Sequence, residues 1–356
     1  MHRSRTEIAV IHDGAFEPKE VVAGLKGYFT LREIALDDYL DNGSQTADLY
    51  VFCTSLRSEN TFRRIKKAVE ICDGEKLFVL PTHNSTSVSR LRDLRVEDHL
   101  QMPVDGSALR AVAKKAINRR VEGAWATLGP TRHKALKTSL ACFEKSFDNI
   151  HRGESLPMDD VLLSAECIRD AAALGGIDGW IDALDQHHNY SFRHSMFVCG
   201  TLSYFCHAMG IDGGELHRLT VGGLLHDIGK SMIPLEILDK PGKLDDREWR
   251  TMKRHPEHSR DILLREMGLD ADVIAMVVHH HEKLDGSGYP DCLLGARIND
   301  HVRLTAIADV FSALIDKRAY KGSMSKEDAL DLMTKFKGHL DMDLVREFRS
   351  FVLDNG

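Results

Sequence analysis

The sequence has no hydrophobic run long enough to cross a membrane. Its apolar stretches fall far short of the roughly 20 consecutive residues that a transmembrane helix needs. The first residues, MHRSRTEIAVIHDG, also lack the long apolar core and the small-residue cleavage site of a secretory signal. The sequence therefore predicts a protein without a membrane span, located in the cytoplasm.

Cysteine pairs and an excess of positive charge are missing as well. There are seven cysteines, an odd number, and no two of them stand in a Cys-x-x-Cys motif. This argues against a disulfide framework and against a thiolate zinc site. The 47 Lys and Arg are outnumbered by 54 Asp and Glu, so the formal net charge is −7. Because nucleic-acid-binding surfaces are normally basic, we expect no nucleic acid partner.

What the chain does contain is enough apolar sequence for folded cores, together with many histidines. Of the 356 residues, 43% are hydrophobic and 28% are charged, which excludes global disorder. At roughly 100–200 residues per domain, this length predicts two domains. The 19 histidines exceed ordinary usage and are unevenly distributed along the chain.

Residues 1–120 alternate short apolar runs with amphipathic stretches. The predicted strands are 7–12, 31–36, 48–54, 76–80 and 99–104, and the predicted helices are 19–28, 59–72, 91–98 and 107–120. Strands that alternate with helices indicate a parallel sheet covered on both faces. We therefore expect a doubly wound α/β domain in this part of the chain.

The remaining sequence has helical periodicity and no strand pattern. Residues 121–180 are predicted to form a helical connector, and residues 181–356 an all-α bundle. The predicted helices are 134–147, 159–174, 192–209, 215–227, 245–267, 271–281, 302–317 and 326–337. The heptad pattern of the connector is too short to establish a dimerising neck, so a homodimer stays open at this point.

Imidazoles and carboxylates occur on successive helices of the predicted bundle. They are His194, His226, Asp227, His255, His279, His280, His281 and Asp309. Imidazole with carboxylate suits iron, manganese, zinc or nickel, whereas the absence of thiolates argues against a structural zinc site. A single histidine on a helix is more often a packed or surface residue, but a cluster of this density favours a metal site.

Two adjacent pairs within this cluster indicate a dinuclear centre. His226 and Asp227 are neighbours in the chain, and the two carboxylate oxygens allow Asp227 to bridge two metals while His226 binds one. The adjacent His280 and His281 suit the same arrangement. A two-metal site activates a water and holds the attacking and leaving oxygens of a phosphoryl displacement.

A longer motif makes the assignment specific. The segment HHEKLDGSGYP at 280–290, together with LLHDIGK at 224–230, resembles the HD-GYP family, a branch of the HD phosphohydrolases. The resemblance extends over roughly residues 185–345. It implies a helical HD-type domain that hydrolyses the bacterial messenger cyclic di-GMP at a metal centre built of iron, with manganese as the other candidate.

The resemblance also implies which residues bind the metals. The expected ligands of one metal are His194, His226, Asp227 and Asp309, and those of the second are Asp227, His255, His280 and His281. Some family members bind a third metal through a Glu placed four residues before the first histidine. This chain has Tyr190 there, so the sequence predicts two metals. Asp185, His187 and His188 lie nearby in the sequence and are expected to form a surface-exposed cluster, with substitution for the missing Glu as the alternative.

Four further residues correspond to family positions near the substrate. Lys230 stands where the family places a lysine against the scissile phosphate, and it is predicted to act in catalysis with Asp227. Arg318 and Lys321 match positions that hold substrate phosphate. Tyr289, in the Gly-Tyr-Pro loop, is predicted to shape the pocket, with contact to a cyclase-class partner protein as the open alternative for this loop.

The expected reaction converts cyclic di-GMP to pGpG, with GMP as a further product left open, in bacterial second-messenger signalling. Two alternatives remain at this point. One is a catalytically silent receptor or scaffold, against which the complete His and Asp set argues. The other is a hydrolase of a different cyclic dinucleotide, because groups that bind phosphate do not distinguish guanine from adenine.

The N-terminal domain resembles a response-regulator receiver that has lost its chemistry. A working receiver needs an acidic pair after the first strand, an Asp at the end of the third and a Lys after the fifth. Here the corresponding sequences are His12-Asp13, Cys53 and Gln101-Met102-Pro103. A thiol does not form the aspartyl phosphate, so we predict a pseudo-receiver; an unrelated dimerisation domain and a redox role for Cys53 are the alternatives.

Overall fold

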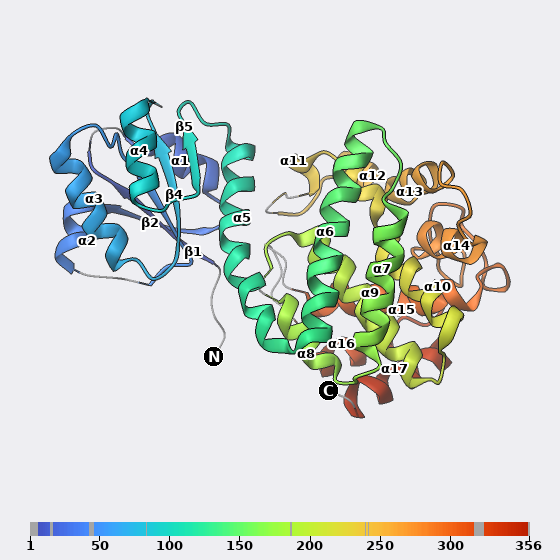
Figure 1. Cartoon of the computed structure of the whole chain (residues 1–356). Helices are drawn as coiled ribbons and strands as arrows, with labels where there is room; N and C mark the ends of the chain where they lie inside the picture. Colours follow the sequence, from blue (N-terminus) through green and yellow to red (C-terminus); the bar gives the residue numbers. More distant parts are fainter. Residues whose placement is uncertain are drawn as a thin grey trace. The chain divides into compact units, whose positions relative to one another are not determined.

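The computed structural model describes residues 6–14, 17–42, 46–82, 84–185, 187–238, 240, 242–316 and 324–354. The chain divides into two compact units, Met1–Val121 and Glu122–Gly356. Each unit is described by itself below, with the element labels of Figure 1.

The first unit is built on a parallel five-stranded sheet with the order β2-β1-β3-β4-β5. Its strands are β1 (Glu7–His12), β2 (Thr30–Ala35), β3 (Leu49–Cys53), β4 (Glu75–Leu80) and β5 (Asp98–Gln101). Its helices are α1 (Lys19–Leu25), α2 (Leu36–Asn42), α3 (Glu59–Ile71), α4 (Ser85–Asp93) and α5 (Gly106–Ala124). This strand order is that of the flavodoxin-like fold, which confirms the predicted fold class.

Alternate residues of the strands pack against two different sets of helices. Val10 and Val51 pack with the apolar side chains of α1 and α5 on one face. On the other face, Phe52 and its neighbours pack with those of α2, α3 and α4. Because both faces are buried, β3 is buried along its whole length and reads as one continuous apolar run.

Two helices of this unit differ from the prediction: α2 was not predicted, and α4 lies at a different position. The sequence predicted a short helix at 91–98, whereas α4 begins at Ser85. The Asn84 side chain accepts a hydrogen bond from the Ser87 amide at 2.8 Å and so caps the helix. The Ser and Thr residues of the first turn give no apolar period that would reveal this start.

The second unit is helical, and its described residues contain no β-strand. Its α-helices are α6 (Pro130–Arg152), α7 (Met158–Ala172), α8 (Ile177–Leu184), α9 (Tyr190–Ala208), α10 (Gly213–Leu225), α11 (Leu235–Leu238), α12 (Asp246–Met252), α13 (His255–Leu263), α14 (Ala271–His279), α15 (Asp300–Ile315), α16 (Lys326–Met333) and α17 (Met342–Asp354). Three 3-10 helices complete it: η1 (Trp125–Leu128), η2 (Ile228–Met232) and η3 (Gly295–Arg297).

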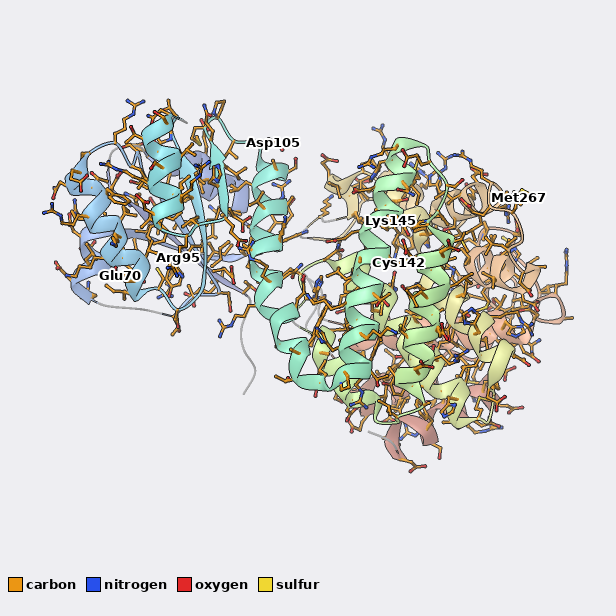
Figure 2. The ribbon with its side chains drawn as sticks, in the orientation of Figure 1. Glu70, Arg95, Asp105, Cys142, Lys145 and Met267 are labelled. Carbon is orange, nitrogen blue, oxygen red and sulfur yellow. The ribbon has the colours of Figure 1, made fainter. Side chains whose placement is uncertain are left out.

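Helix α9 forms the centre of the second unit. Its residues 191–206 are all buried, and it packs against α7, α8, α10, α15 and α17. The predicted connector residues form α6, α7 and α8. Helices α6 and α7 pack side by side (Figure 2). An ion pair of 2.6 Å between Lys145 and Asp160 joins them. Among the described residues, no helix is both long and apolar enough to cross a membrane.

Two predicted helix boundaries are corrected near the histidine cluster. The helix predicted at 245–267 is two helices, α12 and α13, because Pro256 lacks an amide donor and its ring is incompatible with a continuous helix. The helix predicted at 215–227 ends at Leu225, because Asp227 has the non-helical angles φ −106° and ψ 13°. Both breaks lie beside residues of the candidate site.

Candidate metal centre

Two clusters of metal-ligating side chains lie next to each other inside the second unit. One consists of His194, His226 and Asp227, and the other of His255, His280 and His281. Within each cluster the potential ligand atoms all lie within 4.8 Å of one another. The residues come from α9, α13 and the segments just after α10 and α14, so four parts of the chain meet here.

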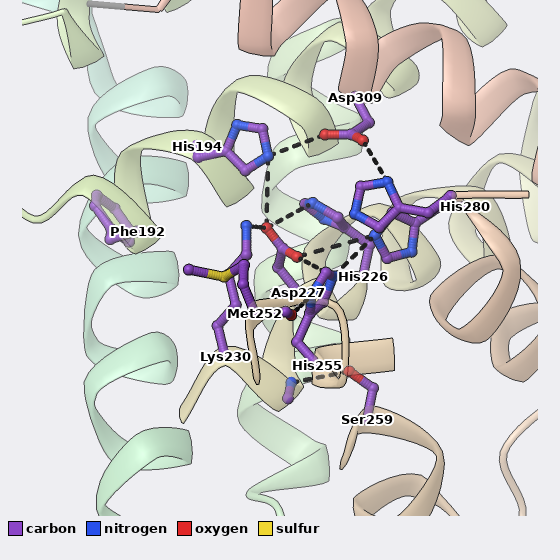
Figure 3. A network of polar contacts seen from close by, with 12 residues as sticks. Phe192, His194, His226, Asp227, Lys230, Met252, His255, Ser259, His280 and Asp309 are labelled. Atoms are coloured by element: carbon purple, nitrogen blue, oxygen red, sulfur yellow. Dashed lines mark hydrogen bonds and ion pairs between the residues drawn. The ribbon is translucent and has the colours of Figure 1, made fainter. Parts of the chain in front are cut away.

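Asp227 belongs to the first cluster and faces the second, and it directs one oxygen to the histidines of each (Figure 3). Its Oδ2 is 3.2 Å from the Nε2 of His226 and 3.4 Å from the Nε2 of His194. Its Oδ1 is 3.2 Å from the Nε2 of His255 and 3.9 Å from the Nε2 of His280. This is the arrangement that a bridging carboxylate requires.

Asp309, on α15, also reaches both clusters. Its Oδ1 is 3.0 Å from the Nε2 of His194, and its Oδ2 is 3.5 Å from the Nδ1 of His281. The sequence had assigned Asp309 to the first metal alone. In the structure it forms a second carboxylate contact between the clusters, on the side opposite the Asp227 backbone (Figure 3).

Three of the histidine rings are oriented by the backbone carbonyl three residues earlier. The pairs are His226 Nδ1 with the Gly223 oxygen (2.8 Å), His255 Nδ1 with the Met252 oxygen (2.8 Å) and His280 Nδ1 with the Val277 oxygen (2.9 Å). In each pair Nδ1 donates, so the proton is held there and Nε2 keeps its lone pair. Such outer contacts orient metal-binding imidazoles and fix their tautomer.

Burial and neighbouring charges set the protonation states of the site. Burial lowers the pKa of His281 to about 3 and that of His280 well below its ordinary value. Burial alone would raise the pKa of Asp227, but the Lys230 ammonium and the His226 imidazole lower it well below its usual range. Burial would lower the pKa of His226, but the adjacent Asp227 carboxylate raises it. His280 and His281 are therefore neutral imidazoles beside ionised carboxylates, which are the forms that bind metal.

Several buried atoms of this site lack a hydrogen-bond partner within the protein. Among the described residues they include the Nε2 of His226 and the Oδ1 of Asp227. Unsatisfied polar atoms are costly when buried, and a divalent cation would satisfy both. The donor set therefore fits metal ions that prefer imidazole and carboxylate ligands.

Lys230 is brought into the same site by η2. The residue is only 8% exposed, and its Nζ pairs with the Oδ2 of Asp227. The predicted catalytic pair thus lies in direct contact (Figure 3). The neighbouring Ser231 carbonyl is 3.0 Å from the Nε2 of His151 at the end of α6, so an earlier helix also supports this turn.

Close packing of η2 on α13 involves two residues that the sequence did not single out. The Gly229 amide donates to the Ser259 hydroxyl at 2.9 Å (Figure 3). A Cβ atom on Gly229 would lie 2.1 Å from the carbonyl oxygen of His255, so only glycine fits. This contact brings Asp227 and Lys230 up to His255.

The Gly-Tyr-Pro loop packs directly on the second cluster. The Tyr289 ring lies 4.7 Å from the His281 ring, centroid to centroid. The buried Glu282 carboxylate, another residue with no role in the prediction, accepts the amides of Asp291 at 2.6 Å and Leu293 at 2.9 Å. A Cβ on Gly288 would lie 2.4 Å from the Glu282 Cα, which explains the glycine. The contacts of Tyr289 fit the predicted pocket-shaping role.

Comparison with known proteins agrees with this geometry. The model of the family described as "HD domain" matches residues 180–344. A cyclic di-GMP phosphodiesterase of Pseudomonas aeruginosa is 31% identical over 250 residues, which are 69% of this chain and 58% of that protein. The helical unit belongs to the HD-GYP family.

Two further similarities help to define the HD-GYP unit. The 3′3′-cGAMP-specific phosphodiesterase 1 of Vibrio cholerae is 38% identical over 183 residues, 51% of this chain and 41% of that protein. An HDG"Y"P protein from Bdellovibrio bacteriovorus shares the fold with a TM-score of 0.50 and 17% identity, over 72% of this chain and 90% of that one. The chain thus covers about half the length of the two relatives named by activity.

The structure also shows the surroundings of two other residues that the sequence analysis discussed, Tyr190 and His187. Tyr190 stacks on His194, with ring centroids 5.8 Å apart. His187, which was expected in a surface-exposed cluster, is instead 1% exposed; its ring stacks on Trp125 and lies tilted against Phe192. That expectation was wrong because Trp125, which covers the ring, lies 62 residues earlier in the chain. Arg318 and Lys321 lie outside the described residues.

In the receiver-like unit, the acid that follows the first strand is engaged in a hydrogen bond. Asp13 accepts from the Thr54 hydroxyl at 2.6 Å, beside the end of β3. Cys53 is fully buried, and burial raises the pKa of its thiol to about 12. Because the thiolate is the reactive form, a redox role for Cys53 is disfavoured.

Proposed function

We propose that this protein is a metal-dependent phosphodiesterase that hydrolyses cyclic di-GMP to pGpG. The observation that carries the proposal is the position of Asp227 between two imidazole clusters, one per carboxylate oxygen. The names of the relatives from P. aeruginosa and V. cholerae support a cyclic dinucleotide as substrate. The intact ligand set favours an enzyme over a silent receptor.

The proposed cofactor is a pair of divalent ions, iron or manganese, with His194, His226, Asp227 and Asp309 around one and Asp227, His255, His280 and His281 around the other. When bound, the ions would polarise the phosphoryl oxygens and make water a stronger nucleophile. Tyr190 supports two ions instead of three, because its phenol ring stacks on His194.

The residues of this chain have separate tasks in the proposed reaction. Water supplies a hydroxyl group to phosphorus and a proton to the departing 3′-oxygen, and the phosphodiester bond that breaks opens the ring to the linear dinucleotide. The Lys230 ammonium, held beside Asp227, is placed to neutralise charge that develops on the phosphoryl oxygens. The carbonyl-bound imidazoles keep their orientation throughout, because Nδ1 of each remains protonated.

A specific alternative is a preference for the hybrid dinucleotide 3′3′-cGAMP. It is favoured by the similarity to the V. cholerae enzyme, which is named for that substrate. The groups assembled around Asp227 are suited to metal and phosphate, which cyclic di-GMP and 3′3′-cGAMP present alike. We therefore place the two substrates side by side in the same test.

The first experiment measures turnover by the whole chain. Protein loaded with Fe²⁺ or Mn²⁺ without oxygen is incubated with cyclic di-GMP and, separately, with 3′3′-cGAMP, and linear products and mononucleotides are quantified. Asp227→Ala should abolish turnover, because removal of the bridging carboxylate disrupts both clusters. Asp261→Ala, an exposed acid on α13, is the matched control and should retain activity.

The outcome separates the candidate functions. Turnover of either substrate that is lost in Asp227→Ala and kept in Asp261→Ala establishes the phosphodiesterase and its base preference. Metal-loaded protein that binds a cyclic dinucleotide tightly without cleaving it would refute the catalytic proposal and leave the receptor.

A further inference from the structure

Arg193 is a buried cation directly beside a residue of the metal centre. It precedes His194 on α9, and only 8% of it is exposed. Its Nε donates to the Oδ1 of Asp316 at 2.8 Å, and its Nη1 donates to the His187 carbonyl at 2.6 Å. The guanidinium therefore joins α9 both to the segment before it and to Asp316 at the end of α15.

The acceptor Asp316 is also buried, at 1% exposed. It caps the C-terminal end of α15, the helix that carries Asp309. Seven residues separate the two acids, about two helical turns, so they lie on nearly the same side of α15. Helices α9 and α15 are thus joined twice, by Arg193 with Asp316 and by His194 with Asp309.

The spacing of these two contacts makes them a positional constraint. They are adjacent on α9 but roughly 10 Å apart along α15, at about 1.5 Å per residue. Two contacts with such different spacing fix how α15 crosses α9, and neither helix can rotate or slide without breaking one of them. His194 and Asp309 meet only in this arrangement.

We infer that the Arg193–Asp316 ion pair is a positioning element of the metal centre, which holds α9 and α15 so that His194 and Asp309 face the same ion. The inference rests on the proposed metal site. A buried ion pair contributes little net stability compared with a well-packed apolar pair, so its geometric effect is the more informative one. Lysine cannot replace the arginine fully, because a single ammonium does not reach two acceptors in the planar geometry of a guanidinium.

Metal affinity provides the test, because it does not depend on any substrate. Full-length protein is freed of metal, and Mn²⁺ is titrated while the signal of free Mn²⁺ is followed by electron paramagnetic resonance. Arg193→Gln and Asp316→Asn should each weaken binding at one of the two sites by about 10–100-fold, the effect typical of lost outer contacts. Arg193→Lys should lie between them and the wild type.

A matched control is present on the same helix. Arg303, near the start of α15, is half-buried and bonds Asp341 at 3.1 Å, at the opposite end of α15 from Asp316. Arg303→Gln should leave Mn²⁺ affinity within about twofold of the wild type. If the Arg193 and Asp316 variants turn over substrate slowly because they bind metal weakly, a higher Mn²⁺ concentration should restore the rate. A misfolded variant would not recover activity in this way.

Each result decides the inference. Wild-type Mn²⁺ affinity in folded Arg193→Gln overturns it, as does an equal loss of affinity in Arg303→Gln. If Arg193→Gln does not fold, unchanged affinity in Asp316→Asn and Arg193→Lys overturns it in the same way. Wild-type protein that binds Mn²⁺ but cleaves no cyclic dinucleotide refutes the proposed function alone, and the affinities of the variants still decide the role of the ion pair.

Discussion

At the scale of single residues, Gly229 controls how closely η2 approaches α13. Gly229→Ala places a methyl group against the His255 carbonyl and the Ser259 amide, both backbone atoms that cannot turn aside. We expect η2 to shift, with a loss of about 1–3 kcal/mol of unfolding free energy and a large loss of activity as Lys230 moves from the site. Thermal unfolding and turnover measure the two effects.

The control for this substitution is another glycine of the same unit. Gly214, in the first turn of α10, has nothing within 4 Å of a Cβ position. Gly214→Ala should therefore be neutral or stabilising by up to about 1 kcal/mol, since alanine loses less backbone entropy in a helix. Equal stability of the two alanine variants would contradict the steric explanation.

At the scale of elements, Glu282 organises the Gly-Tyr-Pro loop. Glu282→Gln replaces one accepting oxygen by an NH₂ group that faces the amide of Asp291 or Leu293. The lost hydrogen bond and the opposed donors should cost about 1–3 kcal/mol of unfolding free energy. Turnover should also fall, because Tyr289 would lose its fixed position on His281. Denaturant unfolding and steady-state kinetics test this.

The exposed Glu257 of α13 provides the comparison for that element. Glu257→Gln removes an exposed ion pair with Arg254, and such pairs contribute little. Its effect should stay within about 0.5 kcal/mol. If Glu282→Gln were as harmless as Glu257→Gln, the carboxylate would not be what holds the loop.

At the scale of the whole molecule, the helical unit brings the predicted metal ligands together, whereas the receiver-like unit has Cys53 and a single acid, Asp13, where a working receiver has acidic groups. With Cys53 at the end of β3 and Asp13 hydrogen-bonded to Thr54, we expect no phosphorylation of the receiver-like unit. Intact-mass measurement after incubation with acetyl phosphate and Mg²⁺ should show no phosphoryl adduct. Turnover measured before and after this treatment should be equal, and an adduct on residues 6–121 would refute the pseudo-receiver assignment.

The sequence predicted local features, such as strands and helices, better than features that depend on contacts between distant residues. The strand–helix alternation predicted the first unit, because periodicity reports which face of each element is buried. The ends of helices near the site were wrong. One predicted helix is divided at Pro256, and another ends before Asp227. Contacts with other elements, such as that of Gly229 with Ser259, stabilise these irregular segments.

By itself the sequence determined the fold classes and the chemical identity of the candidate ligands, since residue types and their spacing carry that information directly. Only the tertiary structure decided that each oxygen of Asp227 faces a different cluster, that Asp309 reaches both, and that Arg193 bonds Asp316. It also buried His187, which the sequence had placed at the surface. These features depend on residues brought together from distant helices, where no local pattern records the contact.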